Sequence, residues 1–187
     1  MKSDYSIHLD SPGEMDLQSA WWSGYENLDL CRSIAAYITG PTVLDAGAGS
    51  GAAIPIWLTE EDVSRVIAVD ISAEAIAALS RMPNVTVVAC DLRELSTPAD
   101  TVICKAVLKH FGPDWRAILQ RLCACARATV IFTMNVAASD GDQNLDVPYS
   151  DWAVPADAIE SAIPHAWQLT TIFGDPKEPV FVCHRKP

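Results

Sequence analysis

The sequence predicts an α/β protein with a doubly wound, seven-stranded, mostly parallel sheet, helices on both faces and an antiparallel last strand. Two observations support this prediction. Apolar runs of strand length alternate along the chain with segments of helical periodicity, a pattern typical of a parallel sheet covered by helices. Near the C-terminus, two strand-like runs, 168–173 and 180–184, are separated by a turn at 174–179, as in a β-hairpin.

The individual elements follow from their apolar patterns and from residues that start or stop helices. The five strands before the hairpin are predicted at 42–45, 65–69, 85–89, 101–104 and 129–133. The predicted helices are 28–38, a stretch through Trp57 and Leu58, a short helix between Ser72 and Pro83, one opened by Pro113, and 155–163. Between Ala137 and Val154 we expect a polar loop without periodicity, and loops of that length often act as lids.

A glycine-rich loop follows the first predicted strand. Gly47, Gly49 and Gly51 stand directly after an apolar run, and a helix-like stretch begins beyond them. Glycine lets the backbone turn tightly and approach a ligand, which the loop then delivers to the amide end of a helix. Asp70 ends the next apolar run, where a carboxylate accepts hydrogen bonds from the two hydroxyls of a ribose. Loop and carboxylate together indicate a nucleoside cofactor.

The spacing of the loop resembles one family in particular. The order Asp45-x-Gly47-x-Gly49-x-Gly51 is similar to motif I of the class I S-adenosylmethionine (SAM)-dependent methyltransferases, whereas the dinucleotide fingerprint reads G-x-G-x-x-G. The likeness spans about Thr42 to Gly112 at the level of motifs. It implies SAM as the cofactor and a fold in which the seventh strand is antiparallel.

The resemblance also assigns cofactor-binding residues. They are Asp45, Ala46, Gly47, Gly49, Asp70, Ile71, Asp91, Leu92 and Lys105. Asp45 would orient the loop or the amino group of SAM, Asp70 would hold the ribose, and Ile71 would pack on the adenine. Asp91 would accept from the adenine amine, with a backbone amide from Leu92.

Two of these assignments have rival interpretations. Asp91 can instead cap the helical segment that follows it. Lys105 either meets an acidic substrate or pairs with a neighbouring carboxylate, and the ion pair is the favoured interpretation.

His110 is the candidate catalytic residue. Many small-molecule methyltransferases carry a histidine a few residues beyond the fourth strand, facing the methyl acceptor, and His110 matches that position. Its pKa near neutrality suits it to take a proton from the acceptor. The alternative is a hydrogen bond to a backbone carbonyl that shapes the pocket wall.

Aromatic and polar residues elsewhere complete the predicted acceptor pocket. Around His110 we expect Trp21, Trp22, Tyr25, Asn135, Tyr149 and Trp152. The N-terminal aromatics lie in a segment that often covers the cofactor in this superfamily, and aromatic faces attract a sulfonium. Their alternative role is to pack that segment onto the edge of the sheet.

Composition excludes several other functions. Twenty-four acidic residues against thirteen basic ones give a formal net charge of −11, which argues against a nucleic-acid substrate. The chain also lacks the Asn/Asp-Pro-Pro-aromatic tetrapeptide after the fourth strand that base-methylating enzymes carry. The six cysteines show no metal-ligand spacing, so we expect free thiols and no metal. No apolar run has the length of a membrane span and the first residues lack a signal-peptide core, which predicts a cytoplasmic protein without membrane contact.

The sequence therefore predicts a SAM-dependent methyltransferase that acts on a small-molecule acceptor at O, N or C. We expect a single domain, with a cap segment and first helix at 1–40, a SAM-binding half at 41–134 and an acceptor side at 135–187. Two alternatives remain: a non-catalytic SAM-binding or partner-binding domain, and a nicotinamide-dependent enzyme. The loop spacing and the absence of a Tyr-x-x-x-Lys pair weigh against the second.

Overall fold

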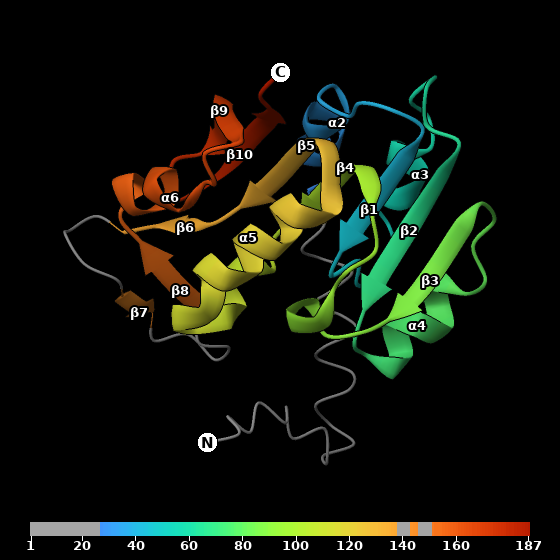
Figure 1. Cartoon of the computed structure of the whole chain (residues 1–187). Coiled ribbons are helices and arrows are strands. Elements are labelled where there is room, and N and C mark those ends of the chain that lie inside the picture. The colour runs from blue at the N-terminus through green and yellow to red at the C-terminus, as the bar shows by residue number, and fades with distance from the viewer. Residues whose placement is uncertain (1–26, 138–142, 146–150) are drawn as a thin grey trace, which may run out of the picture.

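A seven-stranded sheet forms the centre of the computed structural model, which describes residues 27–137, 143–145 and 151–187 (Figure 1). The strands lie in the order β3-β2-β1-β4-β5-β10-β9. Their bounds are β1 Thr42–Ala46, β2 Arg65–Asp70, β3 Val85–Ala89, β4 Ala99–Cys104, β5 Ala126–Thr133, β9 Trp167–Asp175 and β10 Glu178–Arg185. The order reverses between β1 and β4, as in a doubly wound fold, so the predicted fold class is confirmed.

The strands β1 to β5 are parallel, and β10 runs antiparallel to both of its neighbours. Leu44 of β1 pairs with Ile67 of β2 on one side and Val102 of β4 on the other. Phe181 of β10 pairs with Phe132 of β5 in the opposite direction. The carboxyl ends of β1 to β5 therefore meet at one edge of the sheet, the lower edge in Figure 1, where ligands bind in open α/β sheets.

Helices cover both faces of the sheet (Figure 1). The α-helices are α2 Leu28–Ala35, α3 Ile54–Trp57, α4 Ala73–Leu79, α5 Trp115–Cys125 and α6 Ala156–Ala162, and the 3₁₀ helices are η1 Leu92–Glu94 and η2 Leu108–Asp114. The side chains of α2, α3 and α4 join one buried cluster, and those of α5 and α6 join the other. Neighbouring strand residues point to opposite faces, so Val43 belongs to the first cluster and Leu44 to the second.

Two predicted helix ends differ from the structure. Helix α2 stops at Ala35 rather than at 38, because Tyr37 and Ile38 donate to carbonyls three residues back in a tightened last turn. Helix α5 begins at Trp115, and Pro113 lies in the preceding 3₁₀ helix. Gly112, with a φ of 53°, breaks the helical path at that point, so Pro113 cannot open α5.

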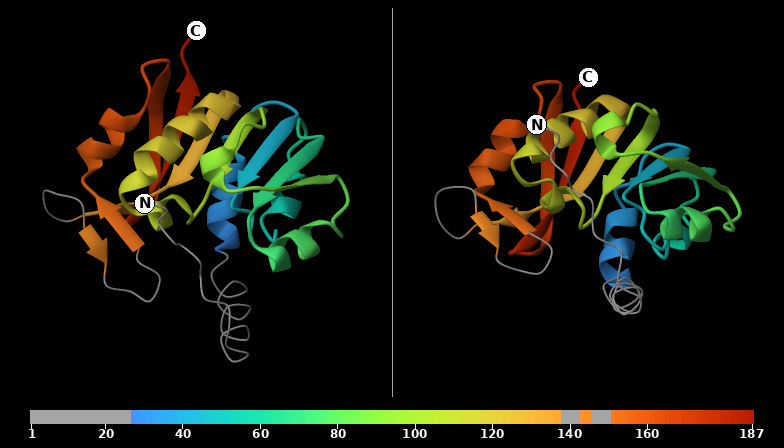
Figure 2. Two further views of the ribbon diagram at one scale, coloured as in Figure 1. Left: turned by 60° about the horizontal axis from the view of Figure 1, so that its bottom comes forward. Right: turned by 90° about the horizontal axis from the view of Figure 1, so that it is seen from below.

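The prediction of an unstructured loop from Ala137 to Val154 is wrong. This stretch contains β7 (Gln143–Leu145) and β8 (Asp151–Val154), which join β6 (Asn135–Val136) in a small sheet of order β6-β8-β7. Such short strands have too few residues to show alternation, and they form by pairing with segments distant in sequence. Figure 2 shows this sheet beside η2 and the start of α5, far from β3 and α4.

The closing hairpin is tighter than predicted. Asp175 and Glu178 pair with each other, so the turn has only Pro176 and Lys177 between the strands rather than 174–179. Glu178 therefore stands at the start of β10, beside the carboxyl end of β5. Within the described ranges, no helix is long and apolar enough to cross a membrane.

Candidate active site

The glycine loop after β1 turns under β2. The amides of Gly47 and Ala48 both donate to the carbonyl of Val69, at 2.8 and 3.0 Å, which folds the loop back across the end of β2. Gly47 has a φ of +80°, and a Cβ placed there would lie 2.5 Å from Cγ2 of Val107. Glycine is required at this position because the backbone is left-handed and the neighbouring side chain leaves no room.

Gly49 differs from Gly47 in what surrounds it. Its φ is +55°, but a Cβ built on it meets no heavy atom within 4 Å. The backbone of the loop is therefore open at Gly49, as the close approach of a ligand requires.

Asp70 connects this loop to the end of β2. One oxygen, Oδ2, accepts from the amide of Gly49 at 2.9 Å, and Oδ1 accepts from the amides of Ile71 and Ser72 at 2.8 and 2.9 Å. The carboxylate thus lies beside the open position at Gly49, where the sequence placed the ribose-binding acid. Its role toward a ribose stays a prediction.

Ile71 follows directly and is 69% exposed. An exposed isoleucine next to Asp70 presents an apolar surface at the edge where a nucleoside is expected, consistent with the predicted contact with adenine. Gly49, Asp70 and Ile71 together fit SAM: an open backbone position, a carboxylate for the ribose and an apolar face for the base. The methionine end would then lie toward the turn at Gly47, whose carboxyl-edge neighbour is the segment after β4.

Asp45 is buried and bonded to the helix beyond the loop. Its Oδ2 accepts from Nε1 of Trp57 at 2.9 Å, and Trp57 is fully buried in α3. This bond joins the strand before the loop to the helix after it, so Asp45 fixes the loop from within. The adjoining Ala46 is also fully buried, at the end of β1.

Asp91 caps η1, which is the rival role that the sequence allowed. Its Oδ1 accepts from the amide of Arg93 at 2.8 Å, and its Oδ2 accepts from the Arg93 guanidinium at 3.0 Å. The Asp91 side chain is 29% exposed, and its predicted contact with adenine stays a prediction beside the observed cap. Leu92 is buried in the core, which leaves its backbone as its route to a ligand.

The segment after β4 lies against the glycine loop. Val107 packs on Gly47, as the blocked Cβ position shows. Lys105 is half-buried directly after the strand, and among the described residues it forms no ion pair, so the favoured pairing with a neighbouring carboxylate is not found. The pairing belongs instead to Lys109, one helical turn further on.

Buried Lys109 and partly exposed Glu178 form an ion pair that the sequence analysis missed. Lys109 is 3% exposed, and its Nζ lies 3.2 Å from Oε2 of Glu178. The other oxygen, Oε1, accepts from the hydroxyl of Thr133 at 3.0 Å, and that hydroxyl accepts from the amide of Ala106 at 2.8 Å. No local pattern in the sequence could have revealed this ion pair, because the partner of Lys109 lies 69 residues away.

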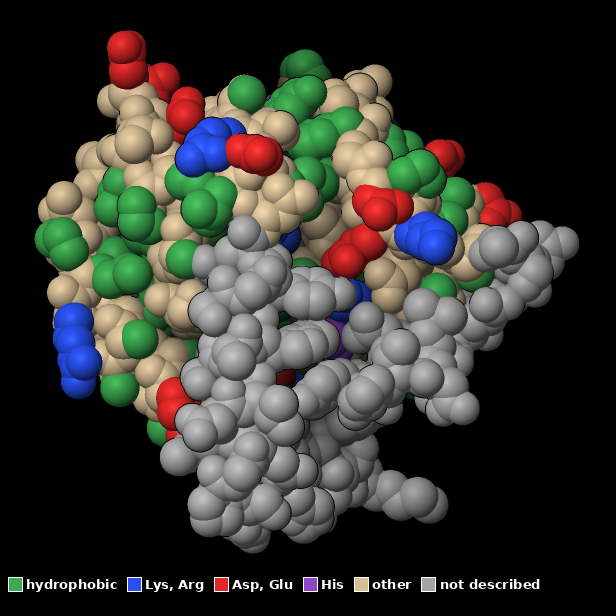
Figure 3. All heavy atoms as spheres, turned by 180° about the vertical axis from the view of Figure 1, so that it is seen from behind, with side chains coloured by type: hydrophobic (Ala, Val, Ile, Leu, Met, Phe, Trp, Pro, Cys, Tyr) green, Lys and Arg blue, Asp and Glu red, His purple; other side chains and the backbone are tan. Residues whose placement is uncertain are grey.

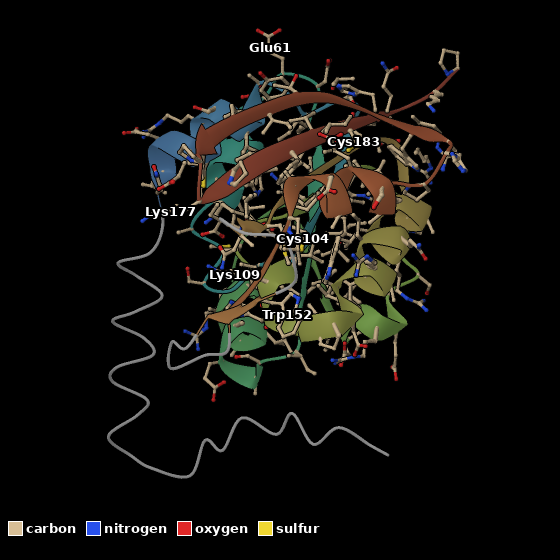
Figure 4. All side chains as sticks on the ribbon, turned by 90° about the vertical axis from the view of Figure 1, so that its left-hand side faces the viewer. Glu61, Cys104, Lys109, Trp152, Lys177 and Cys183 are labelled. Atoms are coloured by element: carbon tan, nitrogen blue, oxygen red, sulfur yellow. The ribbon has the colours of Figure 1, made fainter. Side chains whose placement is uncertain are left out.

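Three of the residues predicted to line the acceptor pocket are described by the structure, and the pocket itself stays a prediction. His110 is exposed on η2, and Asn135 is buried at the start of β6. Trp152 of β8 is half-buried against the core, and its Nε1 is buried without a hydrogen-bond partner among the described residues. In Figure 4, Lys109 and Trp152 both lie below Cys104, the last residue of β4, that is, on the carboxyl side of the sheet. Trp21, Trp22, Tyr25 and Tyr149 lie outside the described residues.

On the face opposite to that of Figure 1, a histidine side chain and several basic and acidic side chains are visible in the half nearer the carboxyl edge (Figure 3). Two surface pockets lie elsewhere. One, of about 470 Å³, is lined by residues of α6, β9 and the C-terminus, including His165 and Trp167. The other, of about 340 Å³, lies between α2 and α3. Neither contains a residue of the predicted site.

The cysteines are free thiols, as predicted. Burial, with a smaller contribution from the charge of Asp45, raises the pKa of the Cys104 thiol to about 12, so it stays neutral at the carboxyl end of β4. Burial likewise raises the pKa of Cys123 and of Cys183 to about 12. Within the described ranges, no group of histidine, cysteine and acidic side chains is arranged to hold a metal ion.

Residues 43–129 match the family model of the methyltransferase domain. This range begins in β1 and ends in β5, so it contains the glycine loop, Asp70, Asp91 and His110. Among curated proteins, none matches the chain significantly.

Solved structures with the same fold include several methyltransferases. Magnesium protoporphyrin IX methyltransferase of Synechocystis PCC 6803, with bound SAM, superposes with a TM-score of 0.62 and 20% identity over 93% of this chain and 79% of that one. The 1,6-didemethyltoxoflavin-N1-methyltransferase of Burkholderia thailandensis, with bound 1,6-didemethyltoxoflavin and S-adenosylhomocysteine, superposes with a TM-score of 0.67 and 21% identity over 96% of this chain and 92% of that one. An O-methyltransferase of neocarzinostatin biosynthesis, with SAM and 2-hydroxy-5-methyl naphthoic acid, superposes with a TM-score of 0.64 and 18% identity over 82% of this chain and 52% of that one.

Proposed function

We propose that this chain is a class I SAM-dependent methyltransferase and that it transfers the methyl group of SAM to a small-molecule acceptor at an oxygen, nitrogen or carbon atom. The observation that carries the proposal is the juxtaposition at the carboxyl edge of β1 and β2. There the open backbone position at Gly49 lies within hydrogen-bond distance of the Asp70 carboxylate, and exposed Ile71 follows.

In the proposed site, the protein binds and aligns rather than supplying elaborate acid–base chemistry. SAM supplies a reactive methyl group on a sulfonium, so alignment of the acceptor for in-line displacement is the main requirement. The residues Gly47, Gly49, Asp70 and Ile71 would hold the cofactor. Asp45 would keep the loop in place through Trp57.

His110 is proposed to face the acceptor and to remove its proton as the methyl group is transferred. Its exposure on η2 supports this role, since the side chain is open to a molecule at the carboxyl edge. Lys105, half-buried after β4 and without an ion pair among the described residues, is proposed to contact an anionic group at the site. Asn135 and Trp152 would enclose the acceptor from the side of the small sheet.

Three features support a small-molecule acceptor. The net charge of −11 opposes binding to a nucleic-acid backbone. Two of the structural neighbours were crystallised with small organic acceptors, 1,6-didemethyltoxoflavin and a naphthoic acid. The small sheet β6-β8-β7 packs against η2, which leaves a compact acceptor side. Cytoplasmic localisation stays a prediction.

The proposal is tested first by thermal unfolding with SAM, S-adenosylhomocysteine, NAD and ATP. A ligand at about 100 times its Kd adds about 2.7 kcal/mol to stability, which raises the Tm by roughly 5–10 °C. We expect a rise with SAM and S-adenosylhomocysteine only. A rise with NAD, or with none of the four, would contradict the proposal.

Transfer of tritium from methyl-labelled SAM to a panel of phenols, amines and carboxylic acids then tests catalysis. We expect His110→Gln to lower kcat by about 100-fold, the lower end of the range for general acid–base catalysis, with S-adenosylhomocysteine affinity unchanged. His165→Gln, at the exposed remote pocket, is the matched control. Equal kinetics in both variants would return His110 to a structural role. Cofactor binding without turnover of any acceptor would instead favour a non-catalytic SAM-binding domain.

A further inference from the structure

We propose that Glu178 is a positioning residue that fixes the segment 105–110 between the cofactor loop and the acceptor. The inference rests on the proposed function, because it assigns that segment to the site of methyl transfer. Glu178 belongs to the closing hairpin and lies outside the range 43–129 that matches the methyltransferase domain. The segment follows β4, and Glu178 reaches it from β10, which lies on the other side of β5 in the sheet.

The Glu178 carboxylate holds the segment at two points with its two oxygens. Oε2 lies 3.2 Å from Nζ of Lys109, near the end of the segment. Oε1 accepts from the Thr133 hydroxyl at 3.0 Å, and Thr133 in turn accepts from the amide of Ala106, near its start, at 2.8 Å. One side chain thus fixes both ends of the stretch that contains Val107 and leads to His110.

The backbone of the segment requires such an anchor. Ala106 has a φ of +59°, a left-handed conformation that residues with a Cβ adopt only when the surroundings impose it. The Thr133 hydroxyl bonds the amide of this same residue, so the network holds the chain at its strained point. The strained turn redirects the chain from β4 into η2.

The segment transmits this anchoring to both halves of the site. Toward the cofactor, Val107 occupies the space that a Cβ on Gly47 would need, so any movement of Val107 changes the support of the glycine loop. Toward the acceptor, His110 follows Lys109 directly, and its amide donates to the carbonyl of Val107 at 3.0 Å. At the far end of η2, the Arg93 guanidinium lies 5.0 Å from the Phe111 ring and 3.7 Å from Asp114.

Energetics favour a positioning role over a purely stabilising one. Desolvating a lysine that is 3% exposed largely offsets its attraction to Glu178, so an apolar pair of similar volume is often as stable. Removing Glu178 alone takes its carboxylate away from the buried charge of Lys109, which destabilises strongly, whereas removing Lys109 alone leaves a carboxylate that is 26% exposed and costs less. The specific contribution of the pair is therefore the directed geometry that it imposes on 105–110.

The test compares Lys109→Met, Glu178→Leu and the double variant with the unaltered protein. Three quantities are measured: the Tm, the Kd for S-adenosylhomocysteine by calorimetry, and amide hydrogen exchange over 105–110 without ligand. We expect Glu178→Leu to lower the Tm by roughly 6–20 °C, Lys109→Met to lower it by less, and the double variant to recover most of the loss seen in Glu178→Leu. We expect the double variant to keep an S-adenosylhomocysteine Kd about five- to tenfold weaker, and about tenfold faster exchange at 105–110.

Arg127→Met supplies the matched control. It breaks an ion pair of 3.3 Å with Asp100, and this pair lies near the amino ends of β4 and β5, away from the segment 105–110. It should leave both the Kd and the exchange at 105–110 unchanged. Recovery of Tm, Kd and exchange together in the double variant would overturn the proposal and leave the pair with a stabilising role only. If the unaltered protein does not bind S-adenosylhomocysteine, the proposed function fails, whereas the exchange over 105–110 still decides whether Glu178 anchors the segment.

Discussion

The glycine loop after β1 and the segment after β4 meet at the same edge of the sheet but are held in place by different means. The loop is held mainly by backbone bonds and by Asp70, which lies 21 residues from Gly49. The segment is held by Glu178, which lies 69 residues from Lys109 and belongs to a strand at the other end of the chain. The support of the glycine loop is thus local in sequence, whereas that of the segment after β4 depends on how the chain closes its sheet.

The family match includes the support of the first region but not that of the second. It covers 43–129, which contains the glycine loop and its partner Asp70 as well as the segment after β4. Glu178, together with β6, β8 and the closing hairpin, lies beyond that range.

The largest expected effect is on folding stability, and it distinguishes Gly47, whose Cβ position is blocked, from Gly49, whose Cβ position is open. Gly47→Ala should lower the free energy of unfolding by about 2–5 kcal/mol, because φ is +80° and the new Cβ would lie 2.5 Å from Val107. Gly49→Ala should cost about 1–2 kcal/mol, since only the left-handed backbone opposes it. Urea unfolding measures both, and equal losses in the two variants would contradict the open position at Gly49.

Asp70→Asn addresses the predicted ribose contact. The asparagine oxygen can still accept from the amides of Ile71 and Ser72. Its nitrogen replaces Oδ2 and is a donor, so it can accept neither from the amide of Gly49 nor from a ribose hydroxyl. We expect a loss of about 1.5–3 kcal/mol in S-adenosylhomocysteine binding, measured by calorimetry. Asp62→Asn, on an exposed loop, serves as the control. Unaltered affinity in Asp70→Asn would remove the ribose assignment.

Ile71→Ala is a milder test of the same side. Because Ile71 is 69% exposed, the substitution should change stability little, but it removes apolar surface from the predicted adenine contact. We expect S-adenosylhomocysteine affinity to fall by about 1–2 kcal/mol. Ile172→Ala, exposed by 50% on the edge strand β9, should leave affinity unchanged, and a similar result for both variants would refute a specific contact.

The smallest expected effect concerns how fast the buried and the half-buried cysteine thiols react. Burial raises the pKa of Cys104, Cys123 and Cys183 to about 12, so below that pH they remain protonated and react slowly, since the thiolate is the nucleophile. Cys90 is only half-buried after β3, although burial raises its pKa as well. Alkylation by iodoacetamide at pH 8, followed by peptide mass spectrometry, should label Cys90 first. Early labelling of Cys104 would show that the carboxyl edge of β4 opens readily.

The sequence alone determined the fold class through its alternation of apolar runs and helices, whereas the strand order came from the structure. The sequence also singled out Gly47, Gly49 and Asp70 as candidates for the cofactor site, because these residues lie in one stretch of chain and their chemistry is visible in their spacing. The sequence left two roles open for Asp91, because an acid before a short helix is equally suited to capping that helix. The structure shows the cap.

Tertiary structure alone decided the acceptor side. The short strands of the small sheet form only by pairing with each other, as Trp152 opposite Asn144 and Asn135 beside Ala153 illustrate. Lys109 looks like any surface lysine until β10 places Glu178 beside it. Local patterns record each residue's own secondary structure and its near neighbours, whereas an ion pair between residues 69 positions apart exists only once the sheet has closed.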